Sequence, residues 1–527
     1  MNAPAWFSRG VSKLLPATGP RLRTAAAPAE RALVDSRAIV PTLAAGAAPA
    51  EPARTTPAEP ARTTPAEPAR TTPAEPVPSQ AARSTRERLQ ASMRRGTEAL
   101  SPRRLRQTLA ELQAVLDSQV SEVEGGRRAC AFAQWYGTVG PEFRRDVWLL
   151  MCEQFAPDAR KVRAAREHYD ATRDTVDAGQ GEIGLRQAIA SPRSRLLQRF
   201  AVFPEGLRFL LDLRTELLAR LPGDKPLLAL DAELEQLFST WFDVAFLELR
   251  RISWDSPASL LEKLIEYEAV HDIRGWTDLK NRLDSDRRCY GFFHPRLPSE
   301  PLIFVEVAFS DALARSITPL LDEAAAPFDL QRASSAIFYS ISSTQNGLRG
   351  VSFGDSLIKR VVETLRAEFP RLRTFATLSP IPGLRAWLKK HASAMLARLD
   401  EKRRTELGRE LGADVVTGES WLRALDGAPA AEPRAAVQRL LLQSAAHYLA
   451  HALDGGKPLD PVARFHLGNG ARVERLNRAA DPSAKGQRQS YGLMVNYLYD
   501  PKRLDRNRSL LAQGKIALSG EIEQLQF

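Results

Sequence analysis

Apolar residues recur at three- and four-residue intervals from about residue 84 to residue 242, which is the period of an amphipathic helix. Two such stripes are formed by Leu105, Leu109, Leu112 and Leu116, and by Leu207, Leu210, Leu211, Leu217 and Leu218. Stripes of this kind pack a core or a subunit interface. The pattern therefore predicts an all-α domain over 85–242 that serves as a scaffold or in oligomerisation.

Beyond this region, short apolar runs of strand length alternate with helical patterns. Leu302–Ala308 and Ala336–Ile341 are rich in β-branched and aromatic residues, as strands are. Ala386–Leu453 returns to a helical pattern, and strand-like runs surround the Asn469-Gly470 pair, which favours a turn. We predict a mixed α/β domain over 243–527 with a helical insertion at about 386–453, which makes the chain α+β as a whole.

One stretch of the second region has the pattern of a strand, a loop, a helix and a second strand. The four parts are Ala336–Ser343, Thr344–Gly354, Asp355–Phe369 and Thr374–Leu378, and Ser379-Pro-Ile-Pro-Gly383 follows them. A glycine-containing loop that leads into a helix directs backbone N–H groups outward at the positive end of the helix dipole, which suits a phosphate or pyrophosphate. The stretch predicts a site for a nucleotide tail with a serine close by.

The first 84 residues have almost nothing to bury. They are dominated by Ala, Pro, Arg and Thr, and the repeat Pro-Ala-Glu-Pro-Ala-Arg-Thr-Thr starts at Pro49, Pro57 and Pro65. Such composition predicts a disordered or extended segment. Residues 1–29 lack acids, which is also typical of an organelle transit peptide, but we prefer a cytoplasmic, bacterial-type protein with a disordered tail. No apolar run reaches the length of a membrane span.

The formal charge of +11 belongs mostly to this extension. Through Ala110 there are 17 Lys and Arg against 8 Asp and Glu, a balance of +9 that leaves only +2 for the rest. The folded part therefore carries no strong electrostatic footprint, and we expect no nucleic-acid partner. Cys130, Cys152 and Cys289 form no CxxC or metal spacing, which favours inert thiols in a reducing compartment.

Four stretches resemble the malonyl-CoA decarboxylase family, in family order from about Arg251 to Tyr499. They are Ser334–Trp387, Arg287–His294, Ala463–Ala471 and Ser490–Tyr499. The resemblance implies a catalytic domain with the fold of the acetyl-CoA-dependent N-acetyltransferases (GNAT-like) and conversion of malonyl-CoA to acetyl-CoA and CO2. It also implies a role in fatty acid metabolism and a homo-oligomer, a dimer or a tetramer, formed through the helical domain.

The resemblance places the family's CoA-binding loop on seven residues: Arg349, Gly350, Val351, Ser352, Phe353, Gly354 and Asp355. Ser352 departs from the pattern, because related sequences have Glu there and acetyltransferase loops have Gly. Gly350 to Gly354 also matches the Gly-x-Ser-x-Gly elbow of serine hydrolases. An elbow follows its strand directly, whereas Gln345–Gly350 intervenes here, so a hydrolase using Ser352 is the less favoured alternative.

From residue type alone, Ser379 suits the start of a turn and His466 suits a structural role. The resemblance instead makes Ser379 the family's catalytic serine and His466 its proton donor, with Tyr499 as a hydrogen-bonding partner. Asn496 and Lys263 lie on matching positions and are possible supporting residues. An imidazole whose pKa can be tuned near neutrality suits proton delivery to carbon.

The reaction implied by the resemblance needs no biotin, metal or pyridoxal phosphate, because the thioester carbonyl can accept the electron pair as an enolate. We therefore expect no cofactor, and His294, His447 and His451 form no convincing metal set. Two further functions remain open. One is a true N-acyltransferase with the same CoA grip, and the other is a noncatalytic helical scaffold.

Overall fold

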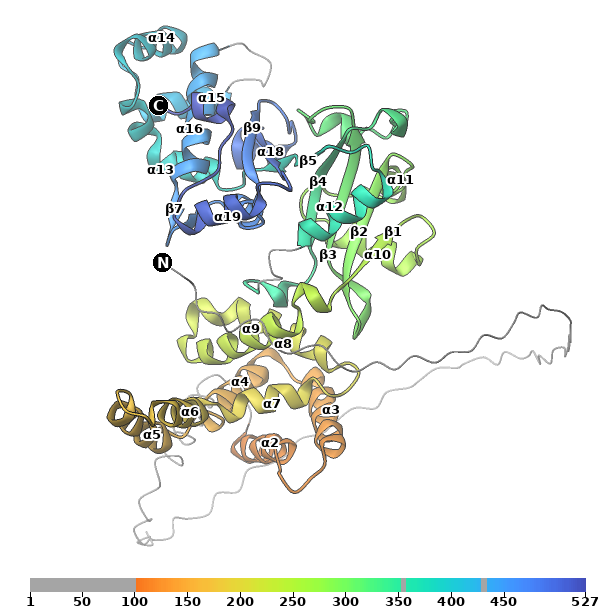
Figure 1. The fold of residues 1–527 in the computed structure, drawn as a ribbon, viewed down its shortest axis with the longest axis vertical. Coiled ribbons are helices and arrows are strands. Elements are labelled where there is room, and N and C mark those ends of the chain that lie inside the picture. The colour runs from red at the N-terminus through yellow and green to blue at the C-terminus, as the bar shows by residue number, and fades with distance from the viewer. Residues whose placement is uncertain (1–100, 352–356, 428–433) are drawn as a thin grey trace, which may run out of the picture. The chain divides into compact units, whose positions relative to one another are not determined.

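The computed structural model describes residues 101–351, 357–427 and 434–527 of the protein (Figure 1), and the predicted tail lies outside them. The described chain begins with a series of helices. Ser101 and Ser121 cap the first two by accepting hydrogen bonds from backbone N–H groups of the first turn. The helices are α2 (Pro102–Val115), α3 (Glu122–Thr138), α4 (Pro141–Gln154), α5 (Ala159–Thr172), α6 (Ala178–Ile189), α7 (Pro192–Phe200), α8 (Gly206–Arg220) and α9 (Leu228–Trp241).

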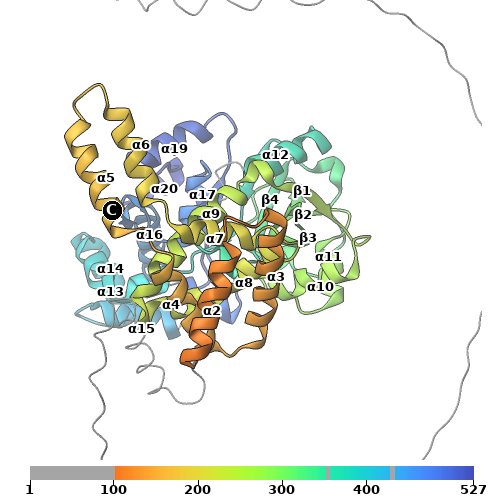
Figure 2. The same ribbon diagram turned by 90° about the horizontal axis from the view of Figure 1, so that it is seen from below.

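The predicted leucine stripes point into the core of this helical region. Leu105 and Leu112 of α2 and Leu210, Leu211 and Leu217 of α8 are buried. Helices α5 and α6 differ from the helices that form this core, because none of the side chains of α5 is buried. These two helices lie side by side as a hairpin (Figure 2).

The second region is built on one mixed sheet. Its strands are β1 (Glu248–Ile252), β2 (Arg287–His294), β3 (Leu297–Ser310), β4 (Ser335–Ser343), β5 (Thr374–Thr377), β6 (Ser379–Pro380), β9 (Arg472–Asn477) and β10 (Met494–Leu498). The order is β1-β2-β3-β4-β5-β10-β6, with β9 on β10. Among these pairs only β4 and β5 run parallel. The predicted α+β class is confirmed.

The parallel pair separates where the predicted serine lies. Ser335 to Phe338 of β4 pair with Thr374 to Thr377 of β5. Past this point the chain pairs with β10 instead, through Ser379 opposite Val495. Strand β4 continues to Ser343 without this partner, so a gap opens between its end and Ser379.

Helix α12 (Leu357–Glu368) connects the two parallel strands. It buries Leu357, Ile358, Val361 and Leu365 in the main core, as the amphipathic pattern predicts. On the other face of the sheet, α10 (Ala258–Tyr267) and α11 (Trp276–Arg282) enclose a smaller core with Cys289, Phe293 and Phe304. The three cysteines are unpaired.

The helical insertion lies between β6 and β9. It contains α13 (Leu384–Ala397), α14 (Glu401–Leu411), α15 (Gly418–Gly427), α16 (Ala435–His451), the short hairpin β7 (Leu453–Asp454) and β8 (Lys457–Pro458), and α17 (Pro461–Gly468). Helix α18 (Ala484–Ser490) precedes β10 in the chain, and α19 (Leu504–Ala512) and α20 (Gly520–Gln524) follow it.

One local prediction is wrong. The residues before the Asn469-Gly470 turn form helix α17, not a strand. Asp460 accepts hydrogen bonds from Val462 N and Ala463 N, and Pro461 occupies the first turn, so the helix start is capped strongly enough to override the β-like composition.

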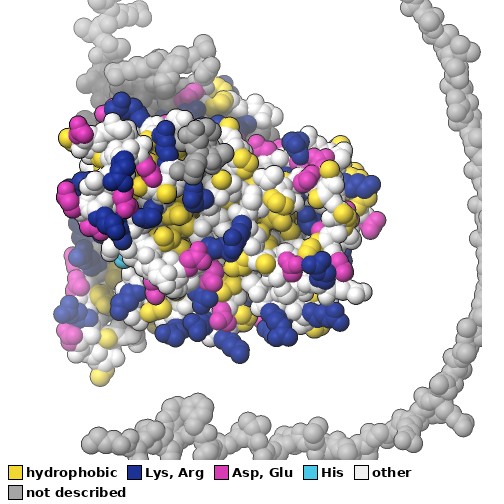
Figure 3. Space-filling model, turned by 90° about the horizontal axis from the view of Figure 1, so that it is seen from above, with side chains coloured by type: hydrophobic (Ala, Val, Ile, Leu, Met, Phe, Trp, Pro, Cys, Tyr) yellow, Lys and Arg dark blue, Asp and Glu magenta, His cyan; other side chains and the backbone are white. Residues whose placement is uncertain are grey.

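Basic and acidic side chains are interspersed over the face shown in Figure 3, as the small charge balance of the folded part predicts. Within the described ranges, no helix is both long and apolar enough to cross a membrane.

Candidate active site

Ser379 lies at the point where β4 and β5 separate, and its side chain is buried. Its hydroxyl donates to Thr377 Oγ1 at 2.9 Å, and its Oγ lies 3.1 Å from His466 Nε2. Thr377 Oγ1 also accepts from the backbone N–H of Tyr497 at 3.1 Å, which ties it to β10. The serine is therefore held by the sheet on one side and by the imidazole on the other.

His466 bridges Ser379 and Tyr499. Its Nδ1 lies 2.7 Å from the Tyr499 hydroxyl, and its ring stacks on Tyr497 with 4.6 Å between centroids. Since the Ser379 proton points to Thr377, the Ser379 oxygen accepts from Nε2–H. A neutral imidazole carries one N–H, so Nδ1 accepts from the Tyr499 hydroxyl.

The imidazole of His466 is uncharged at neutral pH. Complete burial lowers its pKa from 6.5 to about 3, because the cation would lose its hydration and gain no carboxylate partner. Burial also raises the pKa of the Tyr499 hydroxyl well above its usual value, so Tyr499 remains a donor. The site thus holds a neutral N–H group on the side of Ser379.

Ser379 and His466 open onto a cavity of about 220 Å³. Its lining is largely apolar, and no Lys or Arg is found among the described residues of the lining. The remaining lining residues are Val270, Ile303, Phe338, Tyr339, Ile341, Ser343, Pro380, Pro461, Val462 and Phe465. The cavity lies between the separated end of β4 and the Ser379 turn.

Asp460 fixes the helix of His466 relative to the turn of Ser379. Besides capping α17, its carboxylate accepts from Gly383 N at 3.1 Å. Gly383 must remain a glycine, because a Cβ there would lie 2.2 Å from the Tyr448 hydroxyl. Burial raises the pKa of Asp460. A carboxyl of this kind gives no sequence signal beyond an Asp-Pro helix start.

Asn496 supports the same arrangement from β10. It is fully buried, donates to Thr377 O at 2.7 Å and accepts from Asn477 Nδ2 at 2.8 Å. Asn496 therefore fixes the end of β5, where Thr377 is the hydrogen-bond partner of Ser379. Lys263 lies apart from this cluster, since its ammonium donates to Ser299 O at 3.0 Å and pairs with Glu300.

The predicted CoA loop is described only in part. Arg349, Gly350 and Val351 lie within the described residues, whereas Ser352, Phe353, Gly354 and Asp355 lie outside them. Gly350 has φ +85°, a left-handed conformation that a glycine adopts without strain.

Arg214 of α8 supports the start of this loop, a role that the sequence did not reveal. Its buried guanidinium donates to Gly347 O at 2.8 Å and Arg349 O at 2.9 Å, while Asp231 pairs with its Nε at 2.8 Å. The leucine stripe of α8 identified the helix, but nothing local to Arg214 indicated a partner more than a hundred residues away.

Other hydroxyl and imidazole groups of the described chain have partners outside the Ser379–His466–Tyr499 series. Ser340 and Ser342 donate to the carboxylate of Glu268. His447 and His451 lie together in the insertion, with 4.8 Å between ring centroids. Among the described side chains, no group of three His, Cys, Asp or Glu is arranged to hold a metal ion.

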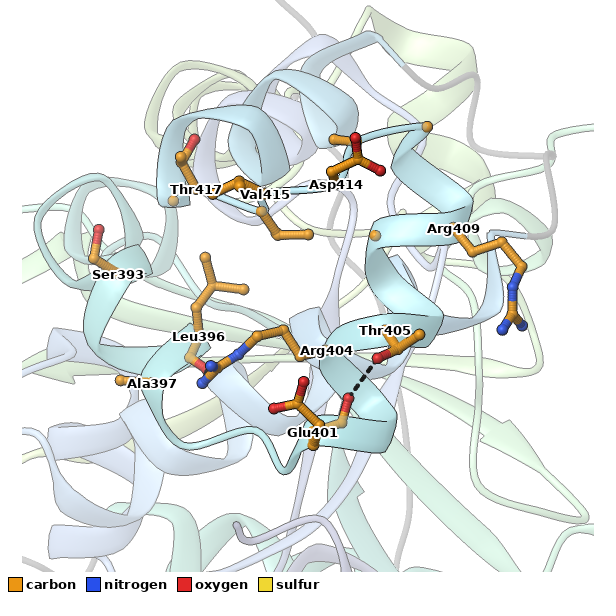
Figure 4. Close-up of a pocket in the computed structure, with 15 residues that line it drawn as sticks. Ser393, Leu396, Ala397, Glu401, Arg404, Thr405, Arg409, Asp414, Val415 and Thr417 are labelled. Atoms are coloured by element: carbon orange, nitrogen blue, oxygen red, sulfur yellow. Dashed lines mark hydrogen bonds between the residues drawn. The ribbon is translucent and has the colours of Figure 1, made fainter.

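The helical insertion contains a larger cleft of about 750 Å³ (Figure 4). Arg404 and Glu401 line it together with Asp414, Val415 and Thr417. None of the predicted site residues lines this cleft, so the chemistry is assigned to the smaller cavity at Ser379.

The buried serine–histidine pair at the point where the parallel strands of the mixed sheet separate has the arrangement of an enzyme active site. The model of the malonyl-CoA decarboxylase C-terminal domain matches residues 245–526, and that of the N-terminal domain matches residues 155–242. The chain belongs to the malonyl-CoA decarboxylase family.

Individual relatives support this assignment over most of their length. A malonyl-CoA decarboxylase of Anser anser anser is 35% identical over 71% of this chain and 78% of its own, and that of Mus musculus is 38% identical over 70% and 79%. Crystal structures of malonyl-CoA decarboxylase match as well. That from Rhodopseudomonas palustris has 40% identity and a TM-score of 0.70, covering 80% of this chain and 99% of its own. That from Cupriavidus metallidurans has 44% identity and a TM-score of 0.66, covering 80% and 100%.

The chain is therefore a decarboxylase of malonyl-CoA, which confirms the predicted function over the N-acyltransferase, hydrolase and scaffold alternatives. The expected cytoplasmic location is wrong as an inference from the sequence, because the relatives from goose and mouse are both named mitochondrial. An acid-poor N-terminus without an apolar segment did not discriminate between the two compartments.

Proposed function

We propose that the malonyl group binds in the cavity at Ser379 and His466, and that the loop 349–355 holds the CoA pyrophosphate. The observation that carries this proposal is the hydrogen-bonded series Tyr499, His466, Ser379. Ser379 and His466 both line the cavity, so a polar side chain of the sheet and one of α17 meet at this part of its wall. A thioester between the separated strands would bring its malonyl end to this point.

The reaction begins when the bond between the carboxylate carbon and the α-carbon breaks. Its electron pair passes to the α-carbon and is shared with the thioester oxygen as an enolate, while CO2 leaves. Ser379 turns its hydroxyl proton from Thr377 Oγ1 to that oxygen, where negative charge grows. Because the thioester itself accepts the electron pair, we propose that no cofactor takes part.

His466 then donates its Nε2 proton to the α-carbon. A neutral imidazole can serve, since the carbanion is the stronger base and the Tyr499 hydroxyl supports Nδ1 as the proton leaves. The negative charge passes from the carboxylate to the enolate and then to the imidazole–phenol pair. That pair regains a proton from water when acetyl-CoA departs.

The apolar lining favours the loss of CO2. Among the described lining residues no cation faces the malonyl carboxylate, whereas the product CO2 is uncharged. An anion that enters such a cavity loses its hydration without full compensation, so the step that removes its charge becomes easier.

The pH dependence of kcat/KM tests whether the donor is neutral. With a pKa of about 3, His466 does not titrate between pH 6.5 and 8.5, so kcat/KM should vary by no more than about threefold there. An imidazolium donor would instead be lost above its pKa, and kcat/KM would fall about tenfold per pH unit. A steady-state profile with malonyl-CoA distinguishes the two, and the tenfold slope would exclude the neutral donor.

We also propose a role for the reaction in fatty acid metabolism. Separately, we propose a homo-oligomer, a dimer or tetramer, in which the α5–α6 hairpin contacts a second copy of the chain. The hairpin leaves three large apolar side chains exposed, at Val176, Ile183 and Ile189. Helix α5 buries none of its own side chains, so the hairpin contributes little to the core of its own chain.

Replacing Ile183 and Ile189 together with Asp should lower the molar mass measured by light scattering to that of a smaller assembly, because two charges would be buried at the interface. Val415→Asp in the insertion, which is 76% exposed, provides the control. An unchanged molar mass in the double variant would place the interface elsewhere.

A further inference from the structure

The active-site cavity has one wall outside the regular elements. Of the described residues that line it, Val270 alone lies in a loop, whereas the others belong to β3, β4, β6 and α17. Backbone pairing in the sheet and the packing of α17 fix the positions of these other lining residues. The position of Val270 depends instead on side chains that hold its turn, Glu268–His271, which we call the Val270 turn.

The sheet holds the Val270 turn from one side. The buried Glu268 carboxylate accepts from the Ser340 hydroxyl at 2.7 and 2.8 Å and from Ser342 at 3.1 Å. It also accepts from two backbone N–H groups of the turn itself, at 2.8 and 2.9 Å. Hydrogen bonds to a carboxylate are among the stronger ones, so this side of the turn is firmly anchored.

Lys485 of α18 holds the turn from the other side. Its ammonium donates to Ala269 O at 2.7 Å and Val270 O at 3.0 Å, and lies 3.6 Å from Asp272. Val270 and Lys485 both line a neighbouring cleft of about 910 Å³. The turn is therefore a thin wall between that cleft and the active-site cavity, and Lys485 supports it on the cleft side.

We propose that Val270 makes the site select an unsubstituted malonyl thioester over malonyl thioesters with an alkyl group on the α-carbon, and that Lys485 is the positioning residue that keeps Val270 in place. The inference rests on the proposed binding of the malonyl group in this cavity. The α-carbon must lie within reach of His466 Nε2 in a cavity of about 220 Å³ that Val270 also lines, and Val270 is the side chain that we propose an added methyl group would meet.

The first test compares malonyl-CoA with racemic methylmalonyl-CoA. Val270→Ala removes two methyl groups from the wall and should raise the ratio of kcat/KM for methylmalonyl-CoA to that for malonyl-CoA by about tenfold or more. Val270→Ile should lower the ratio. The control is Val415→Ala, an exposed valine of the insertion, for which the ratio should not change. A ratio within about twofold of wild type in both Val270 variants would overturn the proposal.

The second test concerns Lys485. Lys485→Met should shift the ratio in the same direction as Val270→Ala, and Lys485→Arg should restore it, because a guanidinium can donate to both carbonyls. The double variant with Val270→Ala should show no larger shift than Val270→Ala alone, since both act through one wall. A lower Tm with an unchanged ratio in Lys485→Met would show a merely structural role.

Failure of this inference differs from failure of the proposed site. An unchanged ratio in the Val270 variants, together with loss of malonyl-CoA turnover in variants of His466 and Ser379, would leave the site intact and refute only the role of Val270. Retained turnover in the His466 and Ser379 variants would refute the site itself.

Discussion

His466→Asn is expected to lower kcat for malonyl-CoA decarboxylation by about a hundredfold or more, the lower range for loss of a general acid. Asparagine can still accept or donate a hydrogen bond at Ser379, but it cannot pass a proton to the α-carbon. KM should change little, because the CoA moiety is proposed to bind at the loop 349–355 and not at His466. The measurement is CO2 release from labelled malonyl-CoA at saturating substrate.

Two further variants sharpen this test. His451→Asn changes an exposed histidine of the insertion that contacts Gln526 and the ring of His447 and does not line the cavity, and it should keep wild-type turnover. Tyr499→Phe leaves Nδ1 of His466 buried without its donor and should lower kcat by about tenfold, from a cost of roughly 1–3 kcal/mol. Turnover of His466→Asn within about threefold of wild type would exclude His466 as the donor.

Ser379→Ala is expected to lower kcat by about 100- to 1,000-fold, as the loss of one hydrogen bond to a developing oxyanion does. The substitution removes the only hydroxyl among the described lining residues that also contacts His466 Nε2. Ser352→Ala should instead act mainly on KM, because the loop is proposed to grip the pyrophosphate through its backbone. Steady-state kinetics of the two variants separate these effects.

Ser509→Ala, on the exposed face of α19, is the matched control for loss of a serine hydroxyl and should leave both kinetic constants unchanged. A fluorophosphonate probe should label neither Ser352 nor Ser379, since the proposed reaction has no covalent serine intermediate. Labelling at Ser352, with activity lost in Ser352→Ala and kept in Ser379→Ala, would replace the decarboxylase site with a hydrolase elbow.

Local patterns predicted much of the fold because each element carries its own signal. The leucine stripes of α2 and α8 follow the helical period, and the β-branched runs of β3 and β4 follow strand composition. Helix α17 was missed because its signal is the cap at Asp460 and not its apolar pattern. A capping residue is decisive only when the backbone around it is known.

The candidate site could be predicted only as far as family motifs reached. Ser379, His466 and Tyr499 each stood in a matching motif, and the structure brings all three into one hydrogen-bonded series. Lys263 stood in a matching position too, yet it pairs with Glu300 outside the cavity. A motif match gives the residue type at a position, whereas its contacts depend on where the chain folds back.

The sequence by itself determined most of the order of helices and strands, with α17 as an exception, and the family. Only the tertiary structure decided which distant groups meet: His466 lies 87 residues from Ser379, Arg214 lies 135 residues from the Arg349 carbonyl it holds, and Lys485 lies 215 residues from Val270. Helix and strand patterns arise from contacts between near neighbours in the chain, and a single sequence records those directly. Contacts across such separations depend on how the sheet and its helices pack together, and so do the burial that keeps His466 neutral and the wall formed by Val270.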